Sequence, residues 1–191
     1  MKLILGSASP RRVELLAKLN INPSKVISPN IDETIKKNEL PLNYCKRIAH
    51  QKLEQFQNKN KGSIILTADT IAYTGRTLVD KTEDENIAFK NLSRLSGKKH
   101  RVSTSFCIRN LENRIFAKTV TTVVSFKVLS DKDIKDYMKT NDWRGVAGSY
   151  KIQGSAESFI KSINGSFSNV VGLPLYEVNN LLVSAGYKWL S

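Results

Sequence analysis

The sequence has very few of the residues that build metal-binding or disulfide-stabilised folds. Its 191 residues include two cysteines, Cys45 and Cys107, and two histidines, His50 and His100. Neither pair has metal-ligand spacing, so a site built on these residues and a disulfide framework are both excluded. So little cysteine is typical of a reducing compartment, and we expect a cytoplasmic protein.

Long apolar runs are also missing. The longest ones, 63–68 and 120–126, have the length of strands and fall well short of the ~18 residues that cross a membrane. The first residues, Met-Lys-Leu-Ile-Leu-Gly, lack the apolar region of a secretory signal. We therefore expect neither membrane association nor secretion.

Acidic residues are in deficit, with 17 Asp and Glu against 30 Lys and Arg, which gives a net charge of +13. This excess fits a polyanionic partner, either a nucleic acid or a phosphorylated small molecule. A lysine-rich surface exposed to solvent explains most of the excess positive charge just as well. Aromatic residues make up only 8% of the chain and no basic run interleaves them, so a nucleic-acid partner is disfavoured.

The remaining composition is that of a globular protein, with 40% hydrophobic and 25% charged residues. No repeat or linker divides the chain, so we expect one domain over residues 1–191. The apolar patterns predict a mixed α/β fold, with a central sheet and flanking helices. The expected strands are 2–5, 63–68, 100–108, 114–129 and 158–163, and the expected helices begin near Pro10, Pro41, Thr82, Ser130 and Pro174.

Ends of elements follow from capping and turn residues. Ser9 before Pro10 predicts a helix N-cap, and Thr82 with Glu85 predicts a capping box. The second helix is expected to run to about Gln57, and the strand that starts at Ser63 is expected to end at Asp69.

The first candidate site is the segment Ser7-Ala8-Ser9-Pro10-Arg11-Arg12 between a strand and a helix. Free N–H groups at a helix start favour anions, and arginine forks bind phosphate. Arg11 and Arg12 could instead be exposed first-turn side chains. Cations are unfavourable at that end of a helix without an anion, which gives mild support to a bound phosphate.

The second candidate is Asp69, which follows a buried strand. Open α/β sheets place their sites at the carboxyl ends of strands, where a carboxylate can hold a divalent metal or activate water. A turn-capping Asp before Thr70 explains the position equally well.

Two lysines and an acid form a third, weaker group. Lys52 shares the helix face of the apolar residues Ile48 and Ala49, although a lysine reaching solvent at the edge of that face is the more common case. Lys81 lies just before a capped helix and Glu33 lies in a loop, and each is ordinary on its own.

The fourth candidate is the glycine-bracketed loop 147–154, whose Gln153 can donate and accept as a nucleobase edge requires. A turn with a solvent-facing amide explains it more simply. Taken together, the four candidates supply cations, acids, a phosphate-type helix start and an amide. That combination points to a nucleotide polyphosphate with a metal.

These segments resemble, in order and spacing, the Maf family of nucleoside triphosphate pyrophosphatases, also called septum-formation inhibitor proteins. The matching segments run along nearly the whole chain: Ser7–Arg12, Asp32-Glu33, Arg47-Ile48-Ala49 with Lys52, Ala68-Asp69-Thr70, Leu95-Ser96-Gly97 with His100, Ala147–Tyr150 with Gln153-Gly154, and Asn169–Pro174. One departure is Thr82 after Lys81, where the family usually has proline.

The resemblance implies an ITPase-like, two-lobed α/β fold with a cleft, and hydrolysis of a nucleoside triphosphate to the monophosphate and pyrophosphate with Mg²⁺ or Mn²⁺. Arg12, Thr70 and Gln153 match the branch that prefers dTTP and UTP, whereas the 7-methyl-GTP branch tends to have Asp-Gln and Glu-Gly at the last two places.

The resemblance also implies roles for the candidates. Asp69 would accept the proton and, with Glu33, contact the metal. The residues that would hold the triphosphate are Ser7, Arg11, Lys52 and Lys81. The expected role is house-cleaning of pyrimidine nucleotides, with a link to septum formation and cell-division arrest. Alternatives are a 7-methyl-GTP or purine nucleotide pyrophosphatase and a non-enzymatic septation regulator that binds nucleic acid, and a homodimer stays open.

Overall fold

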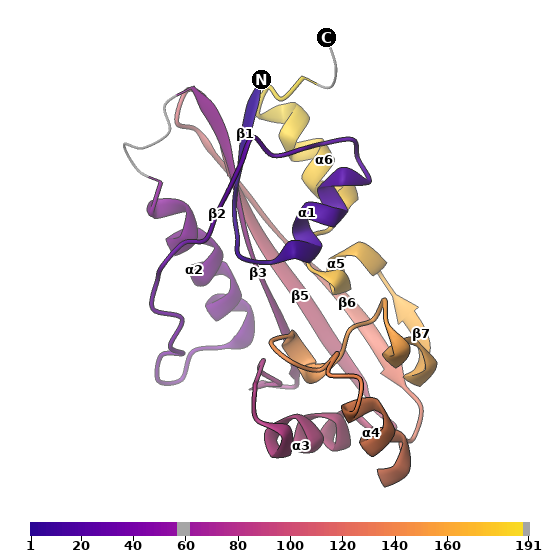
Figure 1. Cartoon of the computed structure of the whole chain (residues 1–191). Coiled ribbons are helices and arrows are strands. Elements are labelled where there is room, and N and C mark those ends of the chain that lie inside the picture. Colours follow the sequence, from indigo (N-terminus) through magenta and orange to yellow (C-terminus); the bar gives the residue numbers. More distant parts are fainter. Residues whose placement is uncertain (57–61, 189–191) are drawn as a thin grey trace. The chain divides into compact units, whose positions relative to one another are not determined.

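The computed structural model describes residues 1–56 and 62–188. Its helices are α1 Pro10–Ala17, α2 Pro41–Glu54, α3 Glu85–Leu95, α4 Asp131–Met138, α5 Phe167–Val171 and α6 Leu175–Ser184. Its strands are β1 Lys2–Gly6, β2 Lys25–Ile27, β3 Ser63–Thr74, β4 Thr77–Leu78, β5 Lys99–Arg109, β6 Ile115–Phe126 and β7 Ile160–Asn164 (Figure 1). No helix in the described residues is long and apolar enough to cross a membrane.

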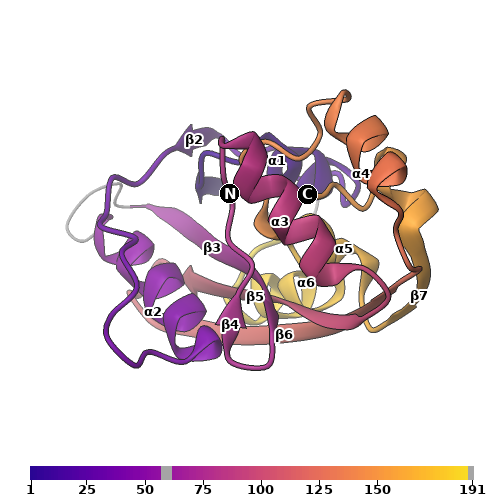
Figure 2. The same cartoon turned by 90° about the horizontal axis from the view of Figure 1, so that it is seen from below.

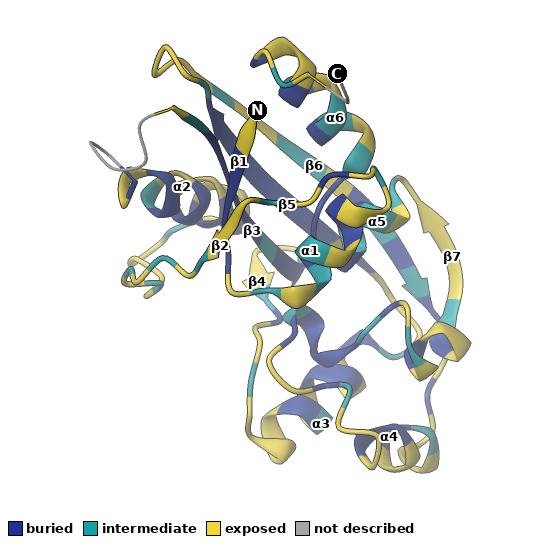
Figure 3. Cartoon of the chain, turned by 45° about the horizontal axis from the view of Figure 1, so that its top comes forward, coloured by how far each residue is buried: buried dark blue, intermediate teal, exposed yellow. Residues whose placement is uncertain are grey.

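Within the described residues the strands form one mixed sheet in the order β2-β1-β3-β5-β6-β7, and β4 pairs with β3. β1 is parallel to both β2 and β3, whereas β4 and β7 run antiparallel to their neighbours. The central strands β1, β3 and β5 are largely buried, and the edge strands β2 and β7 are largely exposed (Figure 3). The predicted mixed α/β class with a central sheet and flanking helices is confirmed.

The chain divides into two compact units. Unit 1 comprises Met1–Asp69, Thr104–Val120 and Gly172–Ser191, and unit 2 comprises Thr70–Ser103 and Thr121–Val171. The chain passes from one unit to the other inside strands β3, β5 and β6. The expectation of one domain over residues 1–191 stays a prediction.

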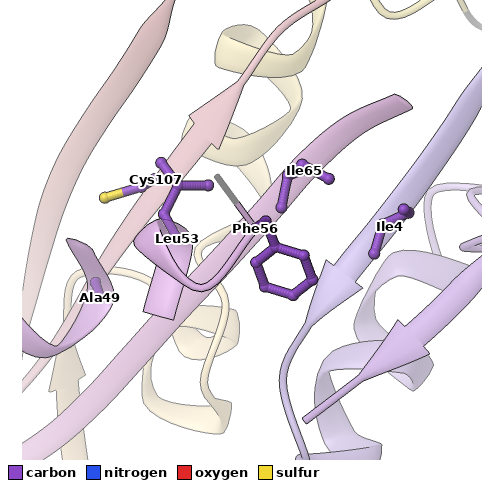
Figure 4. Close-up of a cluster of buried hydrophobic side chains, with 6 residues drawn as sticks. All are labelled: Ile4, Ala49, Leu53, Phe56, Ile65 and Cys107. Carbon is purple, nitrogen blue, oxygen red and sulfur yellow. The ribbon is translucent and has the colours of Figure 1, made fainter. Parts of the chain in front are cut away.

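Unit 1 has its core where α2 packs on the sheet. Ala49, Leu53 and Phe56 meet Ile4 of β1, Ile65 of β3 and Cys107 of β5 in one buried cluster (Figure 4). The apolar spacing along α2 predicted this contact face correctly. α1 and α6 lie on the other side of these strands from α2 (Figure 1).

The turn from β1 into α1 depends on a glycine. A Cβ on Gly6 would lie 2.7 Å from both the Phe56 ring and the Thr67 methyl group, so no larger residue fits there. Ser9 occupies the N-cap position as predicted, but its side chain makes no capping bond. Its N–H instead donates to Ser7 Oγ at 3.2 Å, which closes the turn that presents Ser7.

In unit 2, the β3–β4 hairpin leads into α3, as Figure 2 shows. α3 packs against α4 and the short helical turn Ala147–Ser149. The amide of Asn91 on α3 donates to Ser149 Oγ at 2.9 Å and to the Asp80 carbonyl at 3.0 Å. These bonds tie the glycine-rich loop to the helix.

Several predicted boundaries are wrong. β3 does not end at Asp69 but runs to Thr74, and β6 ends at Phe126, before Leu129. α2 ends at Glu54, and Gln57 lies outside the described residues. β7 begins at Ile160, two residues later than predicted.

The predicted capping box at Thr82 is also wrong. Asp84 caps α3, because its carboxylate accepts from the N–H groups of Asn86 and Ile87 at 2.8 and 3.0 Å. Thr82 Oγ1 accepts from the Asp84 N–H instead. The predicted Ser130 cap is confirmed, with Asp133 completing a reciprocal box.

Candidate active site

A lysine between two carboxylates forms the centre of the candidate site in unit 1. Lys52 Nζ lies 2.8 Å from Asp69 Oδ1 and 2.9 Å from Glu33 Oε1. The Lys52 and Asp69 side chains are each 10% exposed, whereas that of Glu33 is 31% exposed. Three predicted site residues from separate segments therefore meet in one charged cluster. Glu33 is the member of the cluster that is most exposed to solvent.

Helix α2 places Lys52 in this cluster. Ile48, Ala49 and Leu53 face the sheet with essentially no exposure, and Lys52 lies on the same side of the helix. Lys52 is itself buried, so the alternative that it only reaches solvent at the edge of the apolar face is wrong. A buried ammonium requires opposite charge, which the two carboxylates supply.

Strand β3 places Asp69. The last residue of β3 paired with β1 is Thr67, opposite Gly6 at the end of β1. Asp69 thus lies two residues beyond the carboxyl end of its parallel neighbour, although it remains inside its own strand. This position fits the general preference for sites at this edge of a parallel sheet, and the role of Asp69 stays a prediction, whereas the predicted strand end and turn are wrong.

Cys45 on α2 contacts the backbone of Asp69. Its Sγ donates to the Asp69 carbonyl at 3.4 Å, and burial raises the pKa of its thiol to about 12. A thiol with such a pKa stays neutral at pH 7. Cys45 is therefore a buried support of β3 and not a nucleophile.

The two arginines of α1 differ sharply. Arg12 is buried, and its fork donates from Nη1 to Ser7 Oγ at 2.8 Å and from Nε to the Gly172 carbonyl at 2.9 Å. Burial lowers the pKa of Arg12, and nearby Asp69 partly offsets that effect. Arg11 is half-buried, and burial also lowers its pKa.

Arg12 therefore ties the start of α1 to the turn before α6. Gly172 has a φ of 134°, a backbone conformation that favours glycine. The sequence predicted exposed or phosphate-binding arginines, but it could not show that one fork is bonded to a carbonyl 160 residues away.

Unit 2 holds the remaining predicted residues. Lys81 and Gln153 are exposed, and Thr70 is half-buried on β3. The Lys81 N–H donates to Asp80 Oδ1 at 2.8 Å. The Gln153 side-chain amide forms no hydrogen bond within the part of the chain that the structure describes, so both its donor and its acceptor are available.

Sequence reasoning assigned no role to three residues that hold the chain around Glu33. Tyr44 donates from its hydroxyl to the Glu33 carbonyl, and Arg47 forms a two-point ion pair with Glu39. Arg47 belongs to the motif that carried the family resemblance, but no role was assigned to it. The spacing of Tyr44 and Arg47, three residues apart on α2, was the signal that they share a face.

The residues that could hold a metal are Asp69 and Glu33, whose carboxylates both contact Lys52. Among residues 1–56 and 62–188, no group of three or more His, Cys, Asp or Glu side chains is placed to hold an ion. Two carboxylates suit Mg²⁺, which is bound through one or two carboxylates together with water and substrate phosphates. They do not suit a metal that needs a full set of protein ligands.

Comparisons with known proteins show the family of the chain. The family model described as "Maf-like protein" matches residues 2–185. A dTTP/UTP pyrophosphatase of Zymomonas mobilis is 47% identical over 97% of this chain and 92% of its own length. A dTTP/UTP pyrophosphatase of Ruegeria sp. is 46% identical over 98% of this chain and 96% of its own length.

A solved structure of a nucleoside-triphosphatase / dITP/XTP pyrophosphatase from Mycobacterium abscessus also matches. It shares 11% identity and covers 74% of this chain and 95% of its own, with a TM-score of 0.39. That likeness is too weak to support any conclusion.

Proposed function

Because the chain belongs to the Maf-like protein family, we propose that it hydrolyses dTTP and UTP to the monophosphate and pyrophosphate. The observation that carries this proposal is the near-full-length similarity, above 45% identity, to two proteins named dTTP/UTP pyrophosphatase. The cluster of Asp69, Lys52 and Glu33 supplies chemistry that suits such a reaction.

In this reaction a water molecule attacks the α-phosphorus and pyrophosphate leaves. Asp69 accepts the proton of the attacking water, a role that requires an ionised carboxylate within hydrogen-bond reach. Two contacts hold Asp69 in a fixed position on β3. Its carboxylate pairs with Lys52, and its backbone carbonyl accepts a hydrogen bond from the Cys45 thiol. A fixed base loses little entropy when the substrate binds, which favours a fast step.

Asp69 and Glu33 also fit as the ligands of a Mg²⁺ or Mn²⁺ ion that arrives with the triphosphate. When bound, such an ion neutralises phosphate charge and polarises the phosphoryl group that is attacked. Glu33 suits this role because nearly a third of its side chain is exposed and can meet a ligand.

Cations and a hydroxyl would hold the triphosphate. Lys52 and the half-buried Arg11 lie in unit 1 with Ser7, and Lys81 lies in unit 2. Their charges offset the negative charge that grows on the leaving pyrophosphate. Ser7 Oγ already accepts from Arg12, so its own hydrogen is directed away from that bond and can serve a phosphate oxygen.

Arg12, Thr70 and Gln153 would select the base. The available amide of Gln153 complements a uracil-type edge, whose carbonyl acceptors flank an N–H donor. Arg12 differs, because its fork is already bonded to Ser7 and Gly172. We assign to Arg12 an indirect effect, through the placement of Ser7 and of the turn before α6.

The cellular role that follows is removal of surplus or non-standard pyrimidine triphosphates in the cytoplasm, with a link to septum formation. A homodimer is a separate expectation, which sedimentation velocity would check.

A nucleotide panel with Mg²⁺ tests the proposal. Equal concentrations of dTTP, UTP, GTP and 7-methyl-GTP are supplied, and pyrophosphate and orthophosphate are measured separately. We expect pyrophosphate from dTTP and UTP at the highest kcat/KM. A preference for 7-methyl-GTP or another purine nucleotide would favour the purine alternative, and salt-dependent DNA binding without turnover would favour the regulator.

A further inference from the structure

Residues 28–40, here called the Glu33 loop, connect β2 to α2 without forming a helix or strand. Local bonds shape part of it. The Thr34 N–H donates to Asp32 Oδ1 at 2.8 Å, and the Lys36 N–H donates to Glu39 Oε2 at 3.0 Å. These bonds stay inside the loop and do not fix where Glu33 lies relative to Lys52.

Two side chains of α2 attach the Glu33 loop to the helix. The Tyr44 hydroxyl donates to the Glu33 carbonyl at 2.9 Å, and Arg47 Nη2 donates to the Thr34 carbonyl at 3.0 Å. Consecutive carbonyls of the loop are therefore held by residues one helical turn apart. Because Lys52 lies on the same helix, Glu33 and its cationic partner share one rigid support.

Arg47 is itself held firmly. Its Nε and Nη2 donate to the two oxygens of Glu39 at 2.6 Å each, and its Nη1 donates to Gln51 Oε1 at 2.9 Å. The guanidinium also lies over the Tyr44 ring, 5.5 Å from its centroid. The Arg47 bonds lower the pKa of Glu39 to about 2, so the ion pair persists at any pH at which the enzyme would be assayed.

We propose that Tyr44 and Arg47 are positioning residues that set the Glu33 carboxylate against Lys52. This inference rests on the proposed function, because it gives the two residues an effect only through Glu33. An unsupported loop would let Glu33 sample many positions. Holding its backbone removes that freedom before the substrate arrives.

Single substitutions test the support. Tyr44→Phe keeps the buried ring and removes one hydroxyl, so we expect a folded enzyme whose kcat/KM for dTTP falls about three- to tenfold, the value of one hydrogen bond. Arg47→Lys keeps the charge but cannot form the fork, and we expect a fall of about 10- to 100-fold.

Matched controls come from exposed residues of unit 1. Tyr176 is 73% exposed on α6, and Lys46 is exposed on α2 beside Arg47. Tyr176→Phe and Lys46→Gln should leave kcat/KM within about twofold of wild type. A loss in these controls as large as that in Tyr44→Phe would overturn the proposal.

A double-mutant cycle with Glu33→Gln separates positioning from general destabilisation. If Tyr44 and Arg47 act through Glu33, adding Tyr44→Phe or Arg47→Lys to Glu33→Gln should change kcat/KM by no more than about twofold. If the losses multiply instead, the two residues act independently of Glu33 and the proposal is wrong.

Amide hydrogen exchange keeps the inference distinct from the proposed function. If wild type hydrolyses no nucleotide, or Glu33→Gln is fully active, the proposed function or the role of Glu33 fails. The attachment of the Glu33 loop to α2 is then tested by the hydrogen-exchange rates of the amides of residues 34–39. Faster exchange there in Arg47→Lys than in Lys46→Gln supports the attachment of the loop, and equal exchange overturns it.

Discussion

Asp69 and Lys52 in unit 1 are buried and bonded to each other, whereas Lys81 and Gln153 in unit 2 are exposed. The first pair is already assembled without a ligand. The second pair consists of exposed side chains that a ligand could reach. The difference teaches that the proposed base and its ion-pair partner are held in place before a ligand binds, whereas Lys81 and Gln153, proposed for grip and base choice, are exposed to one.

Substitution in the preorganised cluster should have the largest effect. Asp69→Asn keeps the size of the side chain but cannot accept a proton, and we expect kcat to fall about 10²–10⁴-fold. Circular dichroism should show an unchanged fold. A folded variant that keeps most of its activity would make Asp69 a structural residue and remove the contrast between the units.

Lys52→Ala should reduce both stability and activity. The change leaves the buried Asp69 without its ion-pair partner, so we expect the free energy of unfolding to fall by about 3–5 kcal/mol. Urea denaturation measures this loss, and thermal melts with a non-hydrolysable triphosphate measure binding. A ligand-induced shift equal to that of wild type would contradict the role of Lys52 in holding phosphate.

Lys81→Ala is the matched substitution in unit 2. Because Lys81 is exposed, its loss should change unfolding by less than about 0.5 kcal/mol. The ligand-induced shift in the thermal melt should nevertheless shrink. A destabilisation as large as that of Lys52→Ala would show that Lys81 is held within unit 2 as firmly as Lys52 is held within unit 1.

Gln153→Glu should change which nucleotide is preferred. The carboxylate removes the donor and repels the carbonyl oxygens of a uracil-type edge, so dTTP and UTP should lose about tenfold or more in kcat/KM relative to GTP. The same panel applied to wild type provides the reference. If the substitution lowers kcat/KM by the same factor for all four nucleotides, Gln153 supports the structure of its loop and does not select the base.

A pH dependence of stability is expected in the interior of unit 2. His100 lies against Phe126 and Tyr150, its Nε2 is 2.7 Å from the Tyr150 hydroxyl, and burial lowers its pKa to about 4. The unfolded chain binds this proton at its ordinary pKa near 6.5, so stability is present above that pH and is lost as pH falls toward 4.

The loss from His100 should approach about 1.4 kcal/mol for each pH unit within this window. Urea denaturation at pH 7, 6 and 5 measures it in wild type, in His100→Gln and in the exposed control His50→Gln. Only His100→Gln should flatten the slope. An unchanged slope in that variant would assign the acid sensitivity to other groups.

Local patterns predicted much of the fold. The apolar spacing of α2 predicted its buried face, and Ser130 predicted the start of α4. The extent of β3 was missed because Asp69 and Thr70 are typical of turns, whereas pairing with neighbouring strands continues β3 to Thr74. Helix α5 and strand β2 were missed because both are short and carry little periodic signal.

The candidate site likewise has parts that the sequence predicted and parts that it did not. Sequence spacing placed Lys52 on the buried face of its helix, and the family resemblance selected Glu33 from a loop that has no distinguishing pattern. The contacts that join Lys52 to Asp69 and Arg12 to Gly172 span 17 and 160 residues. Contacts of that kind depend on tertiary packing and leave no periodic trace.

Hydrolysis of dTTP in ¹⁸O-labelled water tests the central claim most directly. If water attacks the α-phosphorus, mass spectrometry should find the label in dTMP and none in the pyrophosphate. Label in the pyrophosphate, or release of orthophosphate and dTDP as first products, would contradict the reaction proposed for this chain.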